Sequence, residues 1–464
     1  MTVVQALPRQ SRPRLLRHQR RGTYPIATHH HPRWEGIRSG ELGIEFVNAT
    51  HAAFEFRGRL NLAVLRESVR LLVQRHSILA SQVVDTPAGA RFVFDLDREV
   101  DVQAIDLSGT AAENRRALAV HMAGELVWKP FASSTEAWFR IFVISLGASE
   151  HVIGFVVHHF ICDGWSTAII QGELLALYVA LAAGRRPTPS ELPIQYFDYV
   201  MSMNDWITSG AADSSATYWR DHLRDAPPTR VPPDFHPAPE TAGPLASQSS
   251  HLSIEAVARL RDLSRSRGLL MNAIALAALA ASVAHLTESR DIVIVSRICG
   301  RTQPVLLGLV GAFFDSIALR IRVSMEMTFS AFAGEVQRTL VDSYQHQDYP
   351  YQLVKSSLPV IGASDIAPML NFIDARVVSG HDGRLSRIRP FPLPPAPPST
   401  PTAGRYNGFH TVVRIDEGGL HATTEYLPLL YKEETATRFV RTLCRLLDRA
   451  SWQPQLKLEP LLEV

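Results

Sequence analysis

The chain has 464 residues, of which 46% are hydrophobic, so it can form a substantial core and is not disordered throughout. Its 47 Lys and Arg residues against 45 Asp and Glu residues leave a formal charge of +2, which gives no global electrostatic case for a nucleic-acid-binding protein. The three cysteines are widely spaced and odd in number, which excludes a disulfide framework or a cysteine-built zinc site and indicates a reducing cytoplasm.

The N-terminus is basic, and its first acidic residue is Glu35. Residues 9–22 are rich in arginine and contain no apolar segment of the kind that a secretory signal peptide needs. We expect residues 1–40 to form a mobile basic arm rather than a transit peptide, and such an arm can meet an acidic partner protein. The consecutive histidines 29–31 lack the acids or cysteines that would complete a ligand set, so we expect a loop there and no metal site.

The first half of the chain alternates between predicted helices and strands. Residues 60–79 predict an amphipathic helix, because their apolar residues recur at helical spacing. Short apolar runs bounded by polar or small residues predict buried strands at 91–96, 137–145 and 152–157. An apolar helix follows the last of these strands and is closed by Gly184.

The second half repeats this alternation after a proline-rich, extended connection at 226–244. Its longest apolar run, 268–286, is rich in alanine and interrupted by Asn272 and Ser282, so we interpret it as a buried helix and not as a membrane span. The remaining predicted elements are a helix at 253–268, a strand at 291–298, a strand pair or a strand and loop at 310–323, a β-rich segment at 410–427, and a helix at 433–450 that ends the ordered part. This order favours two α/β lobes.

Residues 158–164, HHFICDG, carry the strongest chemical signal. Adjacent histidines at a strand end point to opposite sides, so one of His158 and His159 faces a pocket and the other packs. A histidine is suited to take a proton from an amine or hydroxyl near neutral pH. Asp163 can orient that ring or pair with an arginine, and Gly164 lets the backbone come close to a substrate.

Two other interpretations stay open on this motif alone. The two histidines can be core residues of a strand. A zinc site fits less well, because only two histidines and one carboxylate are available.

Several segments resemble the motifs of the condensation-domain superfamily of nonribosomal peptide synthesis, relatives of chloramphenicol acetyltransferase, and occur in the same order. Residues 156–166 resemble its catalytic HHxxxDG block. The other matching segments are RHSILAS (75–81), LPIQYFDYVMSMNDW (192–206), YWRDHL (218–223), VGAFFDSIALR (310–320) and HQDYPYQLV (346–354). Together they favour the catalytic interpretation of the histidine pair.

The chain departs from the family pattern in three places. The final arginine of the RHxxLR block is missing, and Asp315 and Ser316 replace the Asn-Thr of the VGxFVNT block. The usual opening block, SxAQxRLWxL, is not recognisable near residues 23–47, so the N-terminal approach to the pocket is expected to differ.

The resemblance implies an α/β fold of two chloramphenicol-acetyltransferase-like lobes that form a V-shaped pseudodimer with a central tunnel. It assigns residues 41–186 to the N-terminal lobe, 187–247 to the connection and 248–464 to the C-terminal lobe. The region near 376–405 corresponds to a lid over the tunnel. Seven of the twelve residues 390–401 are proline, so this lid is expected to be stiff.

The resemblance also implies roles at the site. His159 is expected to deprotonate or position an acceptor nucleophile, and the N–H of Gly164 is expected to stabilise the oxyanion. His158 is expected to pack behind the site, while Asp163 is structural and pairs with an arginine such as Arg301. The further expected pocket residues are Trp165, Ser316 and Asn371, and Cys162 is expected to pack.

The implied function is that of a free-standing condensation enzyme. A donor acyl or aminoacyl group arrives as a thioester on the phosphopantetheine arm of a carrier protein, and an amine or alcohol acceptor attacks it directly, forming an amide or ester without an acyl-enzyme. No tightly bound cofactor is expected, because the carrier supplies the arm. We expect a cytoplasmic monomer with no membrane or nucleic-acid partner.

Two alternative functions stay open. One is a polyketide-associated or CoA-dependent O-acyltransferase of the same superfamily. The other is a non-catalytic module that recruits partner enzymes to a carrier protein, although the intact motif does not favour it.

Overall fold

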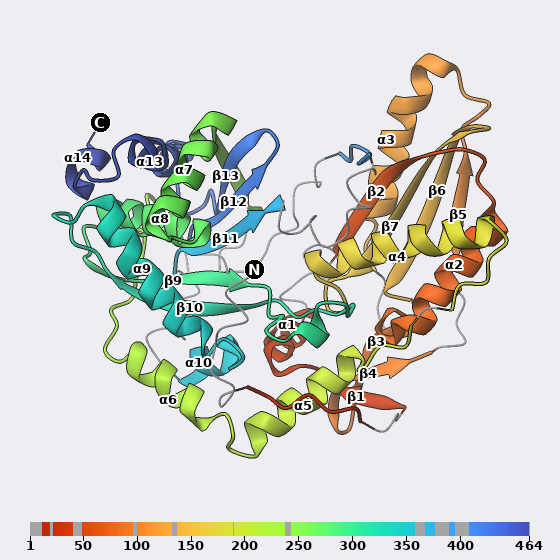
Figure 1. Cartoon of the computed structure of the whole chain (residues 1–464), viewed down its shortest axis with the longest axis horizontal. Coiled ribbons are helices and arrows are strands. Elements are labelled where there is room, and N and C mark those ends of the chain that lie inside the picture. The colour runs from red at the N-terminus through yellow and green to blue at the C-terminus, as the bar shows by residue number, and fades with distance from the viewer. Residues whose placement is uncertain are drawn as a thin grey trace.

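The computed structural model describes residues 12–18, 22–39, 49–95, 100–131, 137–188, 190–236, 243–357, 367–375, 389–394 and 408–463. Figure 1 shows two α/β lobes arranged as the arms of a V. Helices α5 (Tyr196–Thr208) and α6 (Asp213–His222) lie along the base and connect the lobes. The α/β class and the two lobes agree with the sequence prediction.

The N-terminal lobe is built on a four-stranded sheet of order β2-β7-β6-β5, in which only the β5–β6 pair is parallel. Its strands are β2 (Ala49–Arg57), β5 (Val102–Asp106), β6 (Phe139–Gly147) and β7 (Glu150–His158). Its helices are α2 (Leu62–Arg75), α3 (Ala112–Trp128) and α4 (Gly164–Ala182). A smaller sheet of order β1-β4-β3 adjoins it, with β1 (Thr23–Pro25), β3 (Ser81–Thr86) and β4 (Gly89–Phe94), and the turn η4 (Ser77–Ala80) precedes β3.

The C-terminal lobe holds a six-stranded mixed sheet of order β10-β9-β11-β12-β13-β8, in which β11 runs parallel to both neighbours. Its strands are β8 (Ala246–Leu252), β9 (Asp291–Ile298), β10 (Asp315–Arg322), β11 (Met369–Asp374), β12 (His410–Asp416) and β13 (Gly419–Tyr426). Its helical elements are α7 (Ile254–Arg267), α8 (Met271–Thr287), η5 (Pro304–Leu306), α9 (Phe329–Tyr344), α10 (Tyr351–Ser357), α13 (Glu433–Trp452) and α14 (Leu458–Leu462).

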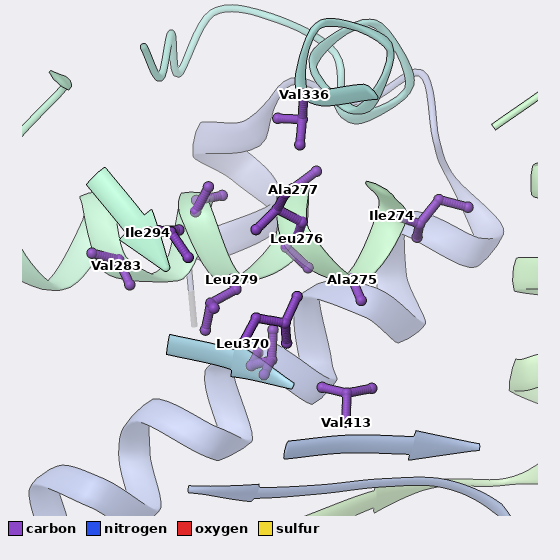
Figure 2. Close-up of a cluster of buried hydrophobic side chains, with 14 of the residues drawn as sticks. Ile274, Ala275, Leu276, Ala277, Leu279, Val283, Ile294, Val336, Leu370 and Val413 are labelled. Carbon is purple, nitrogen blue, oxygen red and sulfur yellow. The ribbon is translucent and has the colours of Figure 1, made fainter. Parts of the chain in front are cut away.

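Helix α8 forms the centre of the C-terminal core. Its residues from 273 to 284 are all buried, which confirms the prediction of a buried helix at 268–286. Figure 2 shows its side chains between Val336 of α9 and the strand residues Ile294, Leu370 and Val413. The small alanines let α8 approach both neighbours closely, so the sheet is covered on this face. By length and composition alone, helix α4 could cross a membrane, as could α7 and α8 if that bent pair were a single span, but α4 packs on α2 and β2.

One segment of the C-terminal half reaches the other lobe. Most of the predicted lid near 376–405 lies outside the described residues, but residues 389–394 are described and run beside the edge strand β2. The backbone N–H of Phe391 donates to the carbonyl of Ala53, and the indole of Trp128 donates to the carbonyl of Pro394 at 3.2 Å. This crossing segment therefore extends the N-terminal sheet and covers its edge.

The N-terminal arm is docked where it is described, contrary to the mobile arm predicted from its charge. The backbone N–H groups of Leu16 and His18 donate to the side chains of Ser202 and Asp198 on α5. The Arg12 guanidinium reaches the carbonyl of Thr302 in the C-terminal lobe. Composition indicated an exposed arm. The contacts that dock it involve partners at least about 180 residues away in the sequence, so no local sequence pattern could predict them.

Two local predictions need correction, and one that left two alternatives open is resolved. Residues expected to form a histidine loop are helical, because η3 (Thr28–His30) leads directly into α1 (His31–Arg38), whose second residue, proline, is well tolerated in a first turn. Of the two alternatives predicted for segment 310–323, the structure has the strand and loop, because irregular chain precedes a strand that begins at Asp315. The ordered part continues beyond residue 450 through α14, whose apolar side chains are buried against the C-terminal core.

An aromatic stack joins α6 to the turn that follows α9. The Tyr218 ring lies 4.0 Å from the ring of His346 and 5.4 Å from that of His222, measured between centroids. The Nε2 atom of His222 accepts a hydrogen bond from the backbone N–H of Arg320 at 3.1 Å. Burial and then the Arg320 charge lower the pKa of His222 to about 4, although Asp342 acts in the opposite direction.

This stack predicts acid sensitivity. Below the ordinary pKa of 6.5, the unfolded chain binds a proton at His222 that the folded chain excludes, so stability falls as the pH drops from 6.5 toward 4. The loss from this group is about 3 kcal/mol at pH 4. In urea unfolding across this range, the free energy of unfolding should depend less on pH in His222→Gln, whose amide keeps an acceptor, than in the wild type. A control variant at the exposed His285 should keep the wild-type pH dependence. An identical pH dependence in wild type and His222→Gln would contradict the assignment.

Candidate active site

The end of strand β7 separates the two adjacent histidines. His158 is the last residue of the strand, and its buried ring stacks on Trp138 with centroids 4.1 Å apart. Its Nδ1 accepts a hydrogen bond from the backbone N–H of Phe160 at 3.2 Å, so this nitrogen is unprotonated. His158 therefore packs within the aromatic core of the N-terminal lobe.

His159 follows the strand and is held in one tautomer. Its Nδ1 lies 2.6 Å from the carbonyl oxygen of Cys162. A carbonyl only accepts hydrogen bonds, so Nδ1 carries the proton and Nε2 carries the lone pair of the neutral ring. The ring lies 4.4 Å from that of Phe314, a residue of the C-terminal lobe. His159 is thus a base whose basic nitrogen is fixed by the turn that follows β7.

Helix α4 begins next to this histidine. Asp163 is its N-cap, because Oδ1 accepts from the backbone N–H of Ser166 at 2.7 Å. Gly164 is the first helical residue, is exposed, and has space around it: a Cβ atom added there would meet no atom within 4 Å. The first N–H groups of a helix have no partner within it and carry partial positive charge, so this helix start can stabilise a developing negative charge.

The carboxylate of Asp163 also joins the two lobes. It forms an ion pair with Arg301 at 3.0 Å, in which the Arg301 side chain has no exposed surface and that of Asp163 is 6% exposed. Its Oδ2 accepts a further hydrogen bond from the backbone N–H of Phe313 at 3.1 Å. One buried carboxylate therefore caps a helix of the N-terminal lobe and binds two groups of the C-terminal lobe.

The C-terminal lobe holds Arg301 from several sides. Its Nη1 donates to the carbonyl of Leu309 at 2.8 Å and also to that of Leu306, and its guanidinium lies 4.2 Å from the Phe313 ring centroid. The preceding Gly300 has a φ of +65°, and a Cβ atom there would lie 1.8 Å from the carbonyl oxygen of Phe313. Only glycine permits this approach, so Gly300 sets the position from which Arg301 reaches Asp163.

Two further residues of the first turn of α4 contact the C-terminal lobe. The Trp165 indole donates to the carbonyl of Leu307 at 3.0 Å. The Ser166 hydroxyl donates to the carbonyl of Gly311 at 2.8 Å and accepts from Arg301 at 2.7 Å. The structure thus places Trp165, half-buried, at the contact between the lobes, and its role in substrate binding stays a prediction.

The other two predicted pocket residues lie on the C-terminal sheet. Ser316 is buried near the start of β10 and accepts a hydrogen bond from Arg297 of β9 at 3.1 Å. Asn371 lies on β11, the neighbour of β9 on its other side. Among the described residues, no hydrogen bond or ring contact joins Asn371 to His159, so its place in a pocket also stays a prediction.

Sequence reasoning missed three residues around His159. Phe314 lies within the predicted block at 310–320, but nothing in the pattern shows that its ring contacts the histidine. Arg297 lies 5.9 Å from the centroid of that same ring. His30 reaches the site from the N-terminal segment, with its ring 6.5 Å from Phe314 and 4.8 Å from Phe160. His30 and Trp34 thus contact Phe160 from a helical segment that does not resemble the usual opening block.

Cys162 lies within the motif but is not poised for chemistry. Its side chain is fully buried, and burial followed by the nearby charge of Asp163 raises the pKa of its thiol to about 12. The thiolate is the nucleophilic form of cysteine, so the thiol is unreactive near neutral pH.

Comparison with known proteins gives one family. The family model "Condensation domain" matches residues 48–462. Among curated proteins, one of the linear gramicidin synthase proteins from Brevibacillus parabrevis is 28% identical over 418 residues, which are 88% of this chain and 5% of that protein. The chain therefore spans a small part of the length of this relative.

Two solved structures are similar in fold. The X-domain from teicoplanin biosynthesis has a TM-score of 0.78 at 20% identity, covering 97% of this chain and 100% of that one. The condensation domain of the monacolin K polyketide synthase has a TM-score of 0.75 at 19% identity, covering 94% of this chain and 99% of that one. The predicted chloramphenicol-acetyltransferase-like fold is thus confirmed, while the pseudodimer and the tunnel stay predictions.

The buried ion pair gives the first prediction for this site. Asp163→Ala should lower the free energy of unfolding by about 3–5 kcal/mol, because it leaves the buried Arg301 charge without its partner. The double variant Asp163→Ala/Arg301→Met should lose less, since it removes both charges. Urea unfolding of the wild type, the single variant and the double variant measures these losses. Equal losses in the single and double variants would show that the pair does not act as a unit.

Proposed function

Since the chain belongs to the condensation-domain family, we propose that it joins an acyl or aminoacyl thioester, carried on the phosphopantetheine arm of a carrier protein, to an amine or alcohol acceptor. A condensation or acyl-transfer role in natural-product synthesis follows from the family. The product would be an amide or an ester. Because the chain matches only a small part of the length of its gramicidin synthase relative, the carrier and the substrates are part of the proposal.

The fixed tautomer of His159 is the observation that carries this proposal. A base must present an unprotonated nitrogen to the nucleophile, and the hydrogen bond from Nδ1 to the carbonyl of Cys162 leaves that role to Nε2. Contact with Phe314 fixes the orientation of the ring. His158 cannot do the same work, because its ring is enclosed by Trp138 and Phe131.

The reaction would proceed by direct attack. Nε2 of His159 accepts or positions the N–H or O–H proton of the acceptor, whose nitrogen or oxygen forms a bond to the thioester carbonyl carbon. Negative charge develops on the carbonyl oxygen, and the N–H of Gly164 at the start of α4 stabilises it. The C–S bond then breaks, and the departing thiolate takes the proton from His159. No enzyme nucleophile is needed, in keeping with the buried, neutral thiol of Cys162.

Asp163 would act on structure in this scheme. Its carboxylate is occupied by the Arg301 guanidinium and by the backbone N–H groups of Ser166 and Phe313. By holding the start of α4 against the C-terminal lobe, it would keep Gly164 and His159 in register. Its effect on catalysis is therefore one of position.

The two alternative functions differ in measurable ways. A CoA-dependent acyltransferase would turn over a CoA thioester at least as fast as the same acyl group on a carrier. A recruiting module would bind partners and turn over neither donor. The likeness to the X-domain concerns the fold and does not favour the second alternative over the first.

Removing the base tests the proposal. With a panel of acyl N-acetylcysteamine thioesters and small amine or alcohol acceptors, His159→Ala should lower kcat/KM at least about 100-fold, the usual contribution of a general base. Thiol release and product mass report turnover, and thermal unfolding confirms that the fold is intact. His285→Ala, at an exposed position on α8, serves as the control. Wild-type rates in His159→Ala would sink the proposal.

Gly164 offers a test that separates chemistry from folding. Because a Cβ atom there meets no protein atom and the backbone is helical, Gly164→Ala should fold with unchanged or slightly higher stability. Its methyl group would stand beside the N–H that faces the thioester oxygen, so kcat should fall about 10-fold or more. Unaltered kcat, measured with the same thioesters, would remove the helix start from the mechanism.

A further inference from the structure

One face of the C-terminal sheet carries a charged side chain close to His159. Along β9, Ile292, Ile294 and Ser296 point into the core beneath α8, as Figure 2 shows for Ile294. Side chains alternate along a strand, so Arg297 points to the opposite face. The register pairs Arg297 with Ser316 of β10 on that face.

The same alternation adds a neighbour on the other side of β9. Leu370 of β11 is core-facing and pairs with Ser296, so the next residue, Asn371, lies on the same face as Arg297. Three adjacent strands, in the order β10-β9-β11, thus present Ser316, Arg297 and Asn371 on one face. A guanidinium flanked by a hydroxyl and an amide is a donor-rich surface.

The charge of Arg297 is not neutralised by the described protein. Its guanidinium donates to the hydroxyl of Ser316 at 3.1 Å, and within the described ranges no carboxylate lies at ion-pair distance from it. The adjacent Asp315 instead accepts hydrogen bonds from the backbone N–H groups of Ser316 and Tyr351. A half-buried cation without a counter-charge favours the binding of an anion.

Arg297 and His159 flank the same ring. The Phe314 centroid is 5.9 Å from the Arg297 Cζ atom and 4.4 Å from the centroid of the His159 ring, so the cation and the base are at most about 10 Å apart. A hydrogen bond at each end takes up roughly 3 Å of this span. What remains is at most a few bonds, which accommodates the separation of the amine or hydroxyl from the carboxyl group in a small amino acid or hydroxy acid and excludes a long chain between them.

We infer that Arg297, with Ser316 beside it, binds a free carboxylate on the substrate whose nucleophile reacts at His159. This inference rests on the proposed function, and it makes the acceptor a small amino acid or hydroxy acid with an unesterified carboxyl group. Arginine binds carboxylates through two parallel hydrogen bonds, which fixes orientation as well as position. The phosphate of a phosphopantetheine arm does not fit, because the whole pantetheine chain separates it from the thioester.

Matched acceptor pairs test this inference. Each amino acid is compared with its carboxamide, and lactate with lactamide, against one neutral donor, the octanoyl thioester of N-acetylcysteamine. The wild type should prefer the carboxylates by about 10- to 100-fold in kcat/KM, and Arg297→Gln should bring that ratio close to one. The amine of a carboxamide has a different reactivity, but this difference is common to all variants, so the change in the ratio isolates Arg297.

Two further variants guard against a folding artefact. Arg297→Lys keeps the charge but not the paired hydrogen bonds, so it should retain part of the preference. Arg322→Gln removes the same charge from the exposed far end of β10, roughly 20 Å along the strand from Ser316, and should behave as wild type. Equal losses for carboxylate and carboxamide acceptors in Arg297→Gln would overturn the inference.

A second arm identifies which substrate carries the carboxylate. Succinyl and butyryl thioesters are compared with a neutral amine acceptor, and an Arg297-dependent preference for succinyl would place the carboxylate on the donor and overturn the acceptor assignment. Saturation-transfer NMR of the amino acid and carboxamide pairs needs no turnover. If no thioester reacts, Arg297-dependent carboxylate binding in that experiment would uphold this inference while the proposed function fails, and its absence would overturn the inference too.

Discussion

The ion pair between Asp163 and Arg301 is the constraint on which the arrangement of the site depends. It is buried, it crosses between the lobes, and its carboxylate simultaneously caps helix α4 and binds the backbone of Phe313. Buried ion pairs add little net stability over apolar contacts, but removing one partner strongly destabilises the protein because the other charge stays buried and unpaired. The pair therefore matters less for stability than for geometry, because it can form in only one relative position of the two lobes.

This relative position of the lobes determines what surrounds His159. The backbone N–H of Phe313 is bound by Asp163, and the next residue, Phe314, places its ring against the imidazole. The strand that starts directly afterwards, β10, brings Ser316 opposite Arg297. The same short stretch of chain, residues 313–316, thus positions the base and the helix start of the N-terminal lobe beside a cationic surface of the C-terminal lobe.

Much of this could be predicted from the sequence, and what could not has a common cause. The run at 268–286 indicated a buried helix because apolarity and length are local properties, and HHFICDG marked the site because the strand, turn and helix cap are consecutive. The sequence did not indicate Arg297 or Phe314, because Arg297 is placed by a strand pairing and Phe314 by a contact between the lobes. The docking of Leu16 and His18 on α5 was missed for the same reason, and composition, which pointed to a mobile arm, was misleading.

The crossing segment has a consequence for the order of folding. Strands β11 and β12 are parallel neighbours in the C-terminal sheet, yet the chain between them travels to the other lobe, where residues 389–394 lie along β2. A parallel pair is normally closed by a local crossover within its own domain. Here the centre of one sheet is closed by an excursion that is anchored on the edge of another, so the loop is long and its closure is slow. The contacts of this segment with Ala53 and Trp128 can form only when the N-terminal lobe offers a folded edge, so the segment couples the stability of one lobe to that of the other.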